Sequence, residues 1–459
     1  MTERSRAIAE LSPTEKRALL ARILQDKARP PLPEQFAISV TDLKTEAILE
    51  PTIRPKSGTR ALATDPARIL LTGATGFLGT FLLSDLLRQT TADIYCLVRA
   101  ANAEAGRQRL HQTLASYGLD DPKHHTRIIP IIGNLSEPLL GLSTPDFRQL
   151  AQTVDAIYHN GAFVNWIYPY ARLKPPNVLG TQEVLRFACE GGVKPVHYVS
   201  TLAVFPVLAN AEVTVIGEQD TLDHGGMLYG GYTQSKWVAE KLVTHARERG
   251  VPVTIYRPSM ITGQSETGVW RTDDVLCRII KSTIELGSTP EVEPTVNMVP
   301  VDYVSKAIVA LSRQPAALGQ VFHIAHAQAV YWQDLFTWIR TFGYPVQSLP
   351  YDAWRDALLQ NGRLQDDTAT YYLMPLFSLG LSQDGDGLVR RIPDFDCRFT
   401  FERLAGTSIT CPPVDRHMFR TYFDYFIRCG FLDAPPTGDH RPPCSNRSTR
   451  ATHTTEVSR

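Results

Sequence analysis

The sequence predicts an α/β fold, a doubly wound parallel sheet that carries a smaller, mainly helical C-terminal subdomain. Short β-prone runs alternate with helix-like stretches as far as about residue 330, which is typical of βαβ units. A glycine-rich loop joins the first of these runs to a helix-like stretch. Beyond residue 330 the alternation fades, and aromatic-rich helical stretches follow, such as YWQDLFTWIRTF and HMFRTYFDYFIRCGF.

Six strands are expected, each a short and almost continuously apolar run. Strands of a parallel sheet are buried on both faces, which explains why these runs do not alternate with polar residues. An apolar-striped helix, residues 80–88, follows the first strand. The expected strands are 68–72, 93–98, 128–132, 156–159, 196–200 and 253–256.

Composition excludes several classes of protein. The 459 residues contain 47 Lys+Arg and 47 Asp+Glu, so the formal net charge is zero. A protein whose main function is to bind nucleic acid or an anionic membrane is therefore not expected, since such proteins have an excess of basic residues. No apolar run approaches the ~18–20 residues of a membrane span, and no signal-peptide core follows Met1. The seven cysteines are scattered without a C-x-x-C pair, which favours reduced thiols and a cytoplasmic protein.

The loop TGATGFLG, residues 72–79, predicts a Rossmann-type dinucleotide site, because a buried strand precedes it and a helix follows it. Gly73 permits the tight turn, Gly76 lets the backbone approach a pyrophosphate, and Gly79 lets helix and strand pack closely. The helix N-terminus offers N–H groups to the phosphates. The expected contacts are Gly73, Thr75, Gly76, Phe77, Leu78 and Gly79.

The residues after the second strand favour NADP(H) over NAD(H). Arg99 stands where NAD sites usually place an acid for the ribose, and a guanidinium pairs with a 2′-phosphate. Arg109 is a second candidate for the same phosphate. Asn134 and Leu135 follow the third strand, where a polar side chain meets the adenine.

The loop after the fourth strand is expected beside the nicotinamide half of the cofactor. It contains Asn160, Gly161 and Ala162, whose small side chains allow a close approach of ligand to backbone. Both this loop and the one after the third strand fall at strand C-termini, where open α/β sheets bind ligands.

A possible catalytic set lies in GYTQSKWVAEKLV and at the end of the fifth strand. Tyr232 and Lys236 are one helical turn apart on one face, and an ammonium beside a phenol is expected to lower the pKa of the tyrosine. Such a tyrosine can protonate a carbonyl oxygen as hydride reaches the carbon. Thr201, or alternatively Ser200, would donate to the developing oxyanion.

Other chemistries find little support in the sequence. His124 and His125 have no third ligand at metal-ligand spacing, so solvated loop histidines and no metal site are expected. The chain has no G-x-S-x-G elbow, and no P-loop lysine follows the glycines, which disfavours a hydrolase or a kinase.

Taken together, GATGFLG, the Tyr232/Lys236 pair and the Ser200-Thr201 strand end resemble the extended short-chain dehydrogenase/reductase superfamily. More specifically, residues 43–433 resemble thioester reductase domains of nonribosomal peptide and polyketide assembly lines, carboxylic acid reductases and aminoadipate reductases. The matching stretches are LLTGATGFLGTFLLSDLL, YCLVRA, IYHNGAFVNW, NVLGTQEVLRFA, HYVSTLAVF, GYTQSKWVAEKLV, YRPSMITGQSETG and VPVDYVSKAIVAL.

The resemblance implies a reaction and a set of roles. A carrier protein would present an acyl thioester on its phosphopantetheine arm, and NADPH would reduce it to an aldehyde, in some members to an alcohol. Thr201 and Tyr232 would stabilise the oxyanion, Tyr232 would be the acid, and Lys236 would hold the ribose. Arg99 and Arg109 match the family's 2′-phosphate contacts, and Asn134 replaces a commoner Asp. The resemblance also brings Ser200, Pro258 and Ser259 to the cofactor.

The chain shows no adenylation signature and no carrier-domain serine motif, so the carrier is expected to act in trans, with the N-terminal helix as a possible docking element. That helix begins with Ser12 as N-cap and Glu15 completing a capping box, and it equally suits docking on its own domain. The expected organisation is an amphipathic helix (1–29), a Pro-rich linker (30–45), an NADP-binding Rossmann domain (46–330, with a substrate-side excursion at about 262–297), a C-terminal substrate-binding subdomain (331–433) and a disordered tail (434–459).

Three rival interpretations share the fold. A fatty acyl-CoA or acyl carrier protein reductase would use the same catalytic residues, with a long apolar tunnel in the C-terminal subdomain. A nucleotide-sugar epimerase or dehydratase would use the same Tyr/Lys pair, although Arg99 and the C-terminal motifs weigh against it. A dinucleotide-sensing regulator typically lacks the pair, which this chain keeps.

Overall fold

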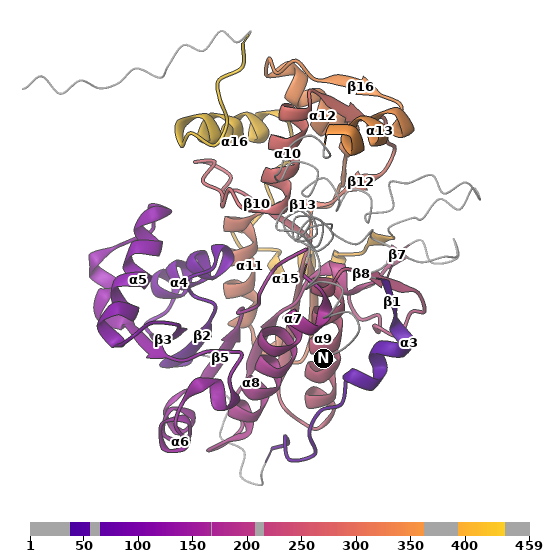
Figure 1. The fold of residues 1–459 in the computed structure, drawn as a ribbon. Coiled ribbons are helices and arrows are strands. Elements are labelled where there is room, and N and C mark those ends of the chain that lie inside the picture. Colours follow the sequence, from indigo (N-terminus) through magenta and orange to yellow (C-terminus); the bar gives the residue numbers. More distant parts are fainter. Residues whose placement is uncertain (1–36, 56–64, 167, 207–214, 362–392, 437–459) are drawn as a thin grey trace, which may run out of the picture.

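The computed structural model describes residues 37–55, 65–166, 168–206, 215–361 and 393–436. Its centre is a seven-stranded sheet in the order β14-β9-β6-β5-β2-β3-β4, and every pairing in it is parallel (Figure 1). The strands are β2 (Arg68–Thr72), β3 (Asp93–Val98), β4 (Ile128–Ile132), β5 (Ala156–His159), β6 (Val196–Val199), β9 (Val253–Pro258) and β14 (Val321–Ile324). The predicted fold class is confirmed. The six expected strands are present, and β14 is a seventh that was not expected.

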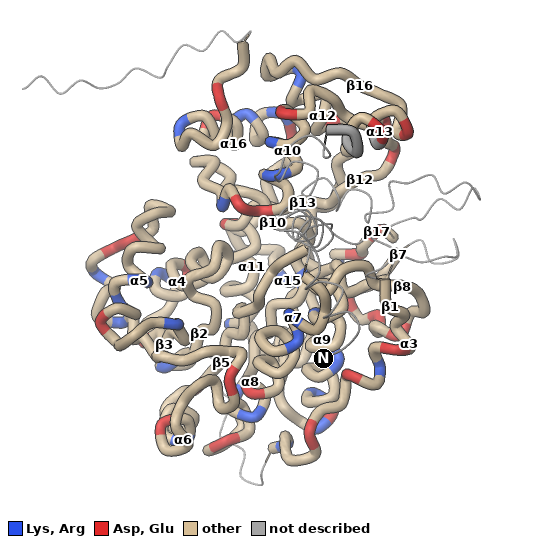
Figure 2. Tube along the Cα trace, viewed as in Figure 1, with Lys and Arg blue, Asp and Glu red and all other residues tan. Residues whose placement is uncertain are grey.

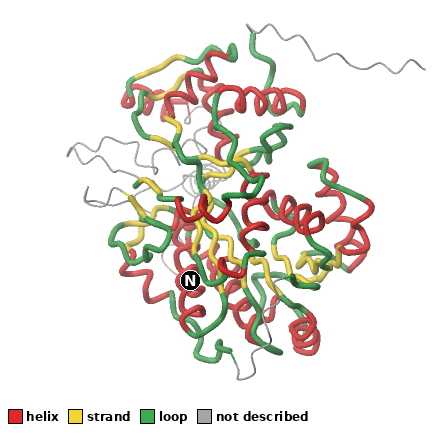
Figure 3. Tube along the Cα trace, turned by 180° about the vertical axis from the view of Figure 1, so that it is seen from behind, coloured by secondary structure: helices red, strands yellow, loops and turns green. Residues whose placement is uncertain are grey.

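Helices cover both faces of the sheet because alternate side chains of each strand point to opposite sides. Ile69 and Leu71 of β2 join one apolar core, whereas Leu70 joins the other. The first core is covered by α4 (Phe77–Gln89), α5 (Ala103–Ser116), α11 (Val301–Ser312) and α15 (Arg398–Leu404). The second is covered by α6 (Thr144–Thr153), α7 (Tyr170–Lys174), α8 (Gly180–Cys189) and α9 (Gly231–Glu248). Viewed from behind, the strands run between these helices (Figure 3).

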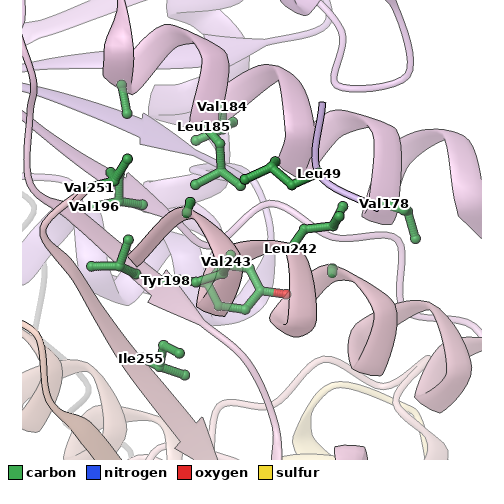
Figure 4. Close-up of a cluster of buried hydrophobic side chains, with 14 of the residues drawn as sticks. Leu49, Val178, Val184, Leu185, Val196, Tyr198, Leu242, Val243, Val251 and Ile255 are labelled. Carbon is green, nitrogen blue, oxygen red and sulfur yellow. The ribbon is translucent and has the colours of Figure 1, made fainter. Parts of the chain in front are cut away.

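The second core joins the sheet to the helices that carry the predicted chemistry. Figure 4 shows Tyr198 and Ile255 of the sheet in one cluster with Val184 of α8 and Leu242 of α9. All four side chains are at most 1% exposed. Close packing of this kind fixes α9 rigidly against β6.

A third apolar core forms a smaller unit at the carboxyl edge of the sheet, drawn at the top of Figure 1. Phe77, the first residue of α4, packs against it. Its elements are α10 (Val275–Leu286), β11 (Ser288–Pro290), β12 (Thr295–Val296), β15 (Val330–Tyr331), α12 (Trp332–Thr341), β16 (Gln347–Leu349), α13 (Tyr351–Asn361) and α16 (Arg416–Arg428). The unit therefore combines the expected excursion with the C-terminal residues.

Part of the C-terminal segment returns to the main domain. β17 (Asp394–Phe395) pairs with β7 (Val215–Ile216), and α15 packs on α11. A second pair, β10 (Met260–Thr262) with β13 (Met298–Pro300), stands where the chain leaves and re-enters the main domain.

The N-terminal end of the described chain is also built into the main domain. Residues 37–45 of the expected linker, together with Glu46, form β1 (Ala37–Ser39), α3 (Val40–Leu43) and a 3₁₀ turn, and β1 pairs with β8 (Met227–Tyr229). Val40 and Leu43 are buried, and this burial gives these residues a fixed place. The predicted N-terminal helix and most of the predicted tail lie outside the described residues.

Among the described residues, no helix is both long enough and apolar enough to cross a bilayer. Acidic and basic residues are interspersed along the trace in Figure 2, in line with the equal numbers of the two in the sequence.

Candidate active site

The predicted site residues lie along one edge of the sheet because all seven strands run in the same direction. The order of the strands reverses between β2 and β5, and the crevice outside such a reversal is where open α/β sheets bind ligands. From one end of the edge to the other stand Pro258 and Ser259 (β9), Ser200 and Thr201 (β6), Asn160, Gly161 and Ala162 (β5), the glycine loop (β2), Arg99 (β3), and Asn134 and Leu135 (β4).

The glycine loop and the loop after β5 press against each other. Gly73 has φ 74°, and a Cβ there would lie 2.6 Å from Gly161 Cα. A Cβ on Gly79 would lie 1.9 Å from the Gly73 carbonyl oxygen. Gly76 caps α4 without a side-chain hydrogen bond, which leaves the N–H groups of the first helical turn for a ligand. Thr75, Phe77 and Leu78 complete this loop and turn.

A buried hydrogen-bond network holds the glycine loop and the loop after β5 in place. Thr72 Oγ1 accepts from Gly161 N at 2.9 Å and lies 2.8 Å from His159 Nδ1. His159 Nε2 lies 2.9 Å from Thr181 Oγ1 on α8. Burial lowers the pKa of His159 to about 3, with Lys236 adding to the effect, so the ring is neutral and can donate one bond and accept another.

Arg99 and Arg109 come together at the end of β3. Both are exposed, and Arg109 donates to the backbone carbonyl of Arg99 at 2.8 Å. At the neighbouring strand end, the Asn134 side chain accepts from Ser136 N at 3.1 Å and closes a turn. Leu135 packs on the β5 loop, since a Cβ on Gly161 would lie 2.6 Å from Leu135 Cδ1.

These residues fit a dinucleotide on two structural grounds. The Gly73–Gly79–Gly161 contacts make a cradle that any side chain would fill. At the other end of the edge, Ser259 Oγ is buried and has no hydrogen-bond partner among the described residues, while Ser259 N donates to Ile324 O at 3.0 Å. A buried hydroxyl without a partner is costly unless a ligand completes it.

Tyr232 stands in the first turn of α9. A Cβ on Gly231 would lie 2.4 Å from the carbonyl oxygen of Tyr168, so glycine lets that segment close over the start of the helix. The Trp166 ring lies 5.3 Å from the Tyr232 ring. Burial raises the pKa of Tyr232 above its ordinary value, and the Asp274 carboxylate reinforces the shift, so the phenol stays protonated.

The amine of Lys236 has partners other than Tyr232. It donates to Tyr198 Oη at 2.8 Å and to the Val199 carbonyl at 2.7 Å. The expectation that Lys236 lowers the pKa of Tyr232 is wrong for this structure, because the amine is drawn to β6 and burial dominates the phenol. Burial lowers the pKa of Lys236 to about 7, against an opposing effect of Glu240.

The structure separates the two hydroxyl candidates at the end of β6. Ser200 is buried and donates its hydroxyl to the Glu240 carboxylate, which also forms a 2.6 Å ion pair with Arg257. Thr201 is partly exposed, and its Oγ1 accepts from Ala203 N at 3.2 Å, which leaves its O–H free to donate. Of the two hydroxyls, that of Thr201 is therefore the one left to donate a further hydrogen bond.

Sequence reasoning missed two residues that position the site. Tyr198 holds the Lys236 amine, and its place two residues before Ser200 in HYVST could have pointed to it. Asn177 accepts from Phe163 N at 2.7 Å and donates to Ser235 Oγ at 2.9 Å, which ties the loop after β5 to α9. Asn177 begins the NVLGTQ stretch, in a one-turn π-helical widening before α8.

Comparison with known proteins shows which family the chain belongs to. The family model described as Male sterility protein matches residues 71–308. One of the linear gramicidin synthase chains of Brevibacillus parabrevis is 42% identical over 403 residues, which are 86% of this chain and 8% of that protein. The chain therefore spans only a small part of that relative.

Two solved structures match over nearly their whole length. The terminal R domain from the myxalamid PKS-NRPS pathway is 42% identical with a TM-score of 0.77, covering 86% of this chain and 99% of that one. The reductase (R) domain of a nonribosomal peptide synthetase from Mycobacterium tuberculosis is 25% identical with a TM-score of 0.66, covering 86% and 100%. The chain thus belongs to the extended short-chain dehydrogenase/reductase superfamily and, within it, to the terminal reductase (R) domains of nonribosomal peptide and polyketide synthases, which are nicotinamide-cofactor-dependent oxidoreductases.

Proposed function

We propose that this chain is an NADPH-dependent thioester reductase that takes an acyl group from the phosphopantetheine arm of a carrier protein and releases it as an aldehyde. One observation carries the proposal. Lys236, one turn after Tyr232, holds the carbonyl of Val199, two residues before Thr201. That bond ties α9 to the strand end that precedes Thr201, and in the proposal the Tyr232 phenol and the Thr201 hydroxyl would act together on one carbonyl oxygen.

Each part of the cofactor has its own set of residues at the edge. The N–H groups at the start of α4 would bind the pyrophosphate, with Thr75, Phe77 and Leu78 around it. Arg99 and Arg109 would bind the 2′-phosphate, and the exposed guanidinium of Arg99 favours NADPH over NADH. Asn134 and Leu135 would line the adenine. The nicotinamide half would lie against Asn160, Gly161, Ala162, Ser200, Pro258 and Ser259, with Lys236 and Tyr232 at its ribose.

The reduced nicotinamide, when bound, supplies a hydride to the thioester carbon. Thr201 and Tyr232 donate hydrogen bonds to the thioester oxygen and stabilise its growing negative charge. Tyr232 then gives its proton to that oxygen, and a hemithioacetal results. When the C–S bond breaks, the hydroxyl proton returns to Tyr232 and the sulfur leaves as a thiol after taking a proton from water. One hydride and one proton thus convert the thioester to an aldehyde and a thiol.

The carrier is the proposed partner because the substrate is a thioester on a phosphopantetheine arm. The relatives whose names describe synthases are much longer than this chain, and in them such a domain is one part of a larger protein. Supply of the carrier in trans stays a prediction.

The test uses the full chain with NADPH or NADH and a panel of acyl-pantetheine thioesters, carrier-bound thioesters and acyl-CoA esters. We expect NADPH to be consumed with pantetheine and carrier-bound thioesters, and an aldehyde to be found. Preference for long-chain acyl-CoA would instead support the fatty acyl reductase. Absence of consumption with every thioester would contradict the proposal and favour a regulator or an epimerase.

A further inference from the structure

Two histidines and a carboxylate meet on α5 and the segment after it, in the part of the main domain that lies to the left in Figure 1. The Asp120 Oδ1 atom lies 3.2 Å from His111 Nδ1 and 2.9 Å from His125 Nε2. One ligand atom from each of the three residues lies within 4.8 Å of the others. Sequence spacing assigned no third ligand to His125, and the fold places His111 and Asp120 beside it.

The three residues are separated in the sequence, and a chain reversal after α5 brings them together. α5 ends at Ser116, and the chain reverses through Gly118, whose φ of 69° suits glycine. The amide of Leu119 donates to the Leu114 carbonyl at 2.9 Å and fixes the reversal. The 3₁₀ turn Pro122–Arg127 then carries His125 back beside His111.

The geometry is close to that of a metal site before the ion enters. Imidazole nitrogen and carboxylate oxygen bind Zn²⁺ at about 2.0–2.2 Å, so adjacent ligands in a tetrahedron stand roughly 3.3–3.6 Å apart. The separations from Asp120, 3.2 Å and 2.9 Å, are hydrogen-bond distances below that range, so the side chains would have to move apart to admit an ion. The side chains are 20% (His111), 25% (Asp120) and 36% (His125) exposed, so water can reach a fourth position.

The three side chains of the cluster converge on one point, whereas the adjacent histidine does not. The His111 and His125 rings have centroids 3.9 Å apart, and one carboxylate oxygen faces both. Both rings therefore present a nitrogen to the same small space beside the carboxylate, and an imidazole nitrogen is a metal ligand. The adjacent His124 is different: its Nε2 lies 3.9 Å from Asp121, and its Nδ1 faces the Arg127 guanidinium at 3.5 Å.

We propose that His111, Asp120 and His125 form a binding site for a divalent transition-metal ion of the Zn²⁺ class, with water in the fourth position. Imidazole ligands select such ions over Mg²⁺ and Ca²⁺, which prefer oxygen. The site shares no residue with the candidate active site. The bound ion would join α5 to the segment before β4 and make this edge of the sheet more resistant to unfolding.

The test is titration of the metal-free full chain with Zn²⁺, Co²⁺ or Mg²⁺, followed by calorimetry and thermal melting. We expect one Zn²⁺ bound per chain at this site and a melting midpoint that rises with Zn²⁺ concentration. The variants His111→Gln and His125→Gln should bind at least about tenfold more weakly, as ligand loss demands. His124→Gln, the matched control, should bind as the unchanged chain does.

A second readout excludes the thiols as the source of binding. Co²⁺ in the proposed site should show visible d–d bands without a sulfur charge-transfer band, and His125→Gln should lose them. Circular dichroism and melting in chelator should show that each variant folds like the unchanged chain. The proposal is overturned if no Zn²⁺ binds, if the His111 and His125 variants bind unchanged, if thiolate bands appear, or if Mg²⁺ binds equally well.

Discussion

At the scale of single residues, the proposed catalysis depends on polar side chains that have different roles because their burial and their hydrogen-bond partners differ. Tyr232 is a buried phenol whose pKa is raised, which suits a proton donor. Lys236 is committed to Tyr198 and Val199. Ser200 is committed to Glu240, so of the two hydroxyls at the end of β6 Thr201 is the one with a proton to offer. Hydrogen-bond partners thus separate the proposed roles of Ser200, Thr201 and Lys236, and burial sets that of Tyr232.

Replacing Tyr232→Phe removes the proposed acid and keeps the ring that packs on Trp166. We expect kcat to fall by about 10²–10⁴-fold, the usual contribution of a positioned acid, and NADPH affinity to fall far less, because Tyr232 is only one of the residues proposed at the nicotinamide ribose. Steady-state turnover and NADPH fluorescence titration measure the two quantities. Tyr331→Phe, at an exposed tyrosine, is the control and should change neither. Intact turnover in Tyr232→Phe would remove Tyr232 from the mechanism.

Replacing Arg99→Ala tests the choice of cofactor. A charged hydrogen bond to the 2′-phosphate is worth roughly 1.5–3 kcal/mol, so KM for NADPH should rise about 10–100-fold while KM for NADH stays the same. Arg88→Ala, an exposed arginine in the last turn of α4, should leave both unchanged. An equal rise in KM for NADPH and for NADH would show that Arg99 does not bind the 2′-phosphate.

At the scale of elements, α9 is the part that joins the sheet, the loop after β5 and the catalytic tyrosine. Its first turn is covered by residues 168–170, which approach so closely that Gly231 has no space for a side chain. Further along, Lys236 and Glu240 bond to the end of β6. The position of Tyr232 therefore depends on a backbone contact at the start of α9 and on side-chain hydrogen bonds of Lys236 and Glu240 further along.

The variant Gly231→Ala tests this dependence. Its Cβ would lie 2.4 Å from Tyr168 O and also 2.4 Å from Tyr170 N, both backbone atoms that cannot move alone. We expect a loss of about 1–3 kcal/mol in unfolding free energy and lower turnover, measured by urea titration and NADPH consumption. Gly225→Ala is the matched control, because a Cβ there meets nothing within 4 Å. Equal stability of the two variants would argue against the close contact.

At the scale of the whole molecule, the central sheet contains three buried histidines that must stay neutral for the fold to be stable. His159, His197 and His323 lie on three different strands, and burial lowers the pKa of each to about 3 from an ordinary 6.5, with Lys236 assisting at His159 and Arg257 at His323. In the unfolded chain the three histidines take up protons near pH 6.5, whereas in the folded chain they do so only near pH 3. The stability they support is complete above pH 6.5 and is lost as pH falls toward 3.

Replacing His197→Gln should reduce this acid sensitivity. His197 lies 3.1 Å from Tyr256 Oη, so the variant is expected to be less stable than the unchanged chain at pH 7.5. At pH 5 the difference should shrink by about 1–2 kcal/mol, since each pKa unit is worth about 1.4 kcal/mol. Urea unfolding at both pH values measures this change. A difference for His197→Gln that stays constant between the two pH values would contradict the linkage.

The sequence by itself determined the fold class, the first six strands of the sheet, the glycine loop and the place of Tyr232 and Lys236 along the chain. These features are local: apolar runs, glycines at a turn and the spacing of one helical turn all act within a few residues. β6 and β9 differ from the expected bounds by only one or two residues. The family could be recognised for the same reason, because its motifs are short segments.

The tertiary structure alone decided which groups meet. It assigned the hydroxyl of Ser200 to Glu240, turned Lys236 toward Tyr198, added β14 to the sheet and brought His111, Asp120 and His125 together. It also returned residues 394–404 to the main domain. These outcomes depend on packing between segments that are far apart in the chain or joined by a reversal, and periodicity and motif spacing carry no information about which side chains then compete for one partner.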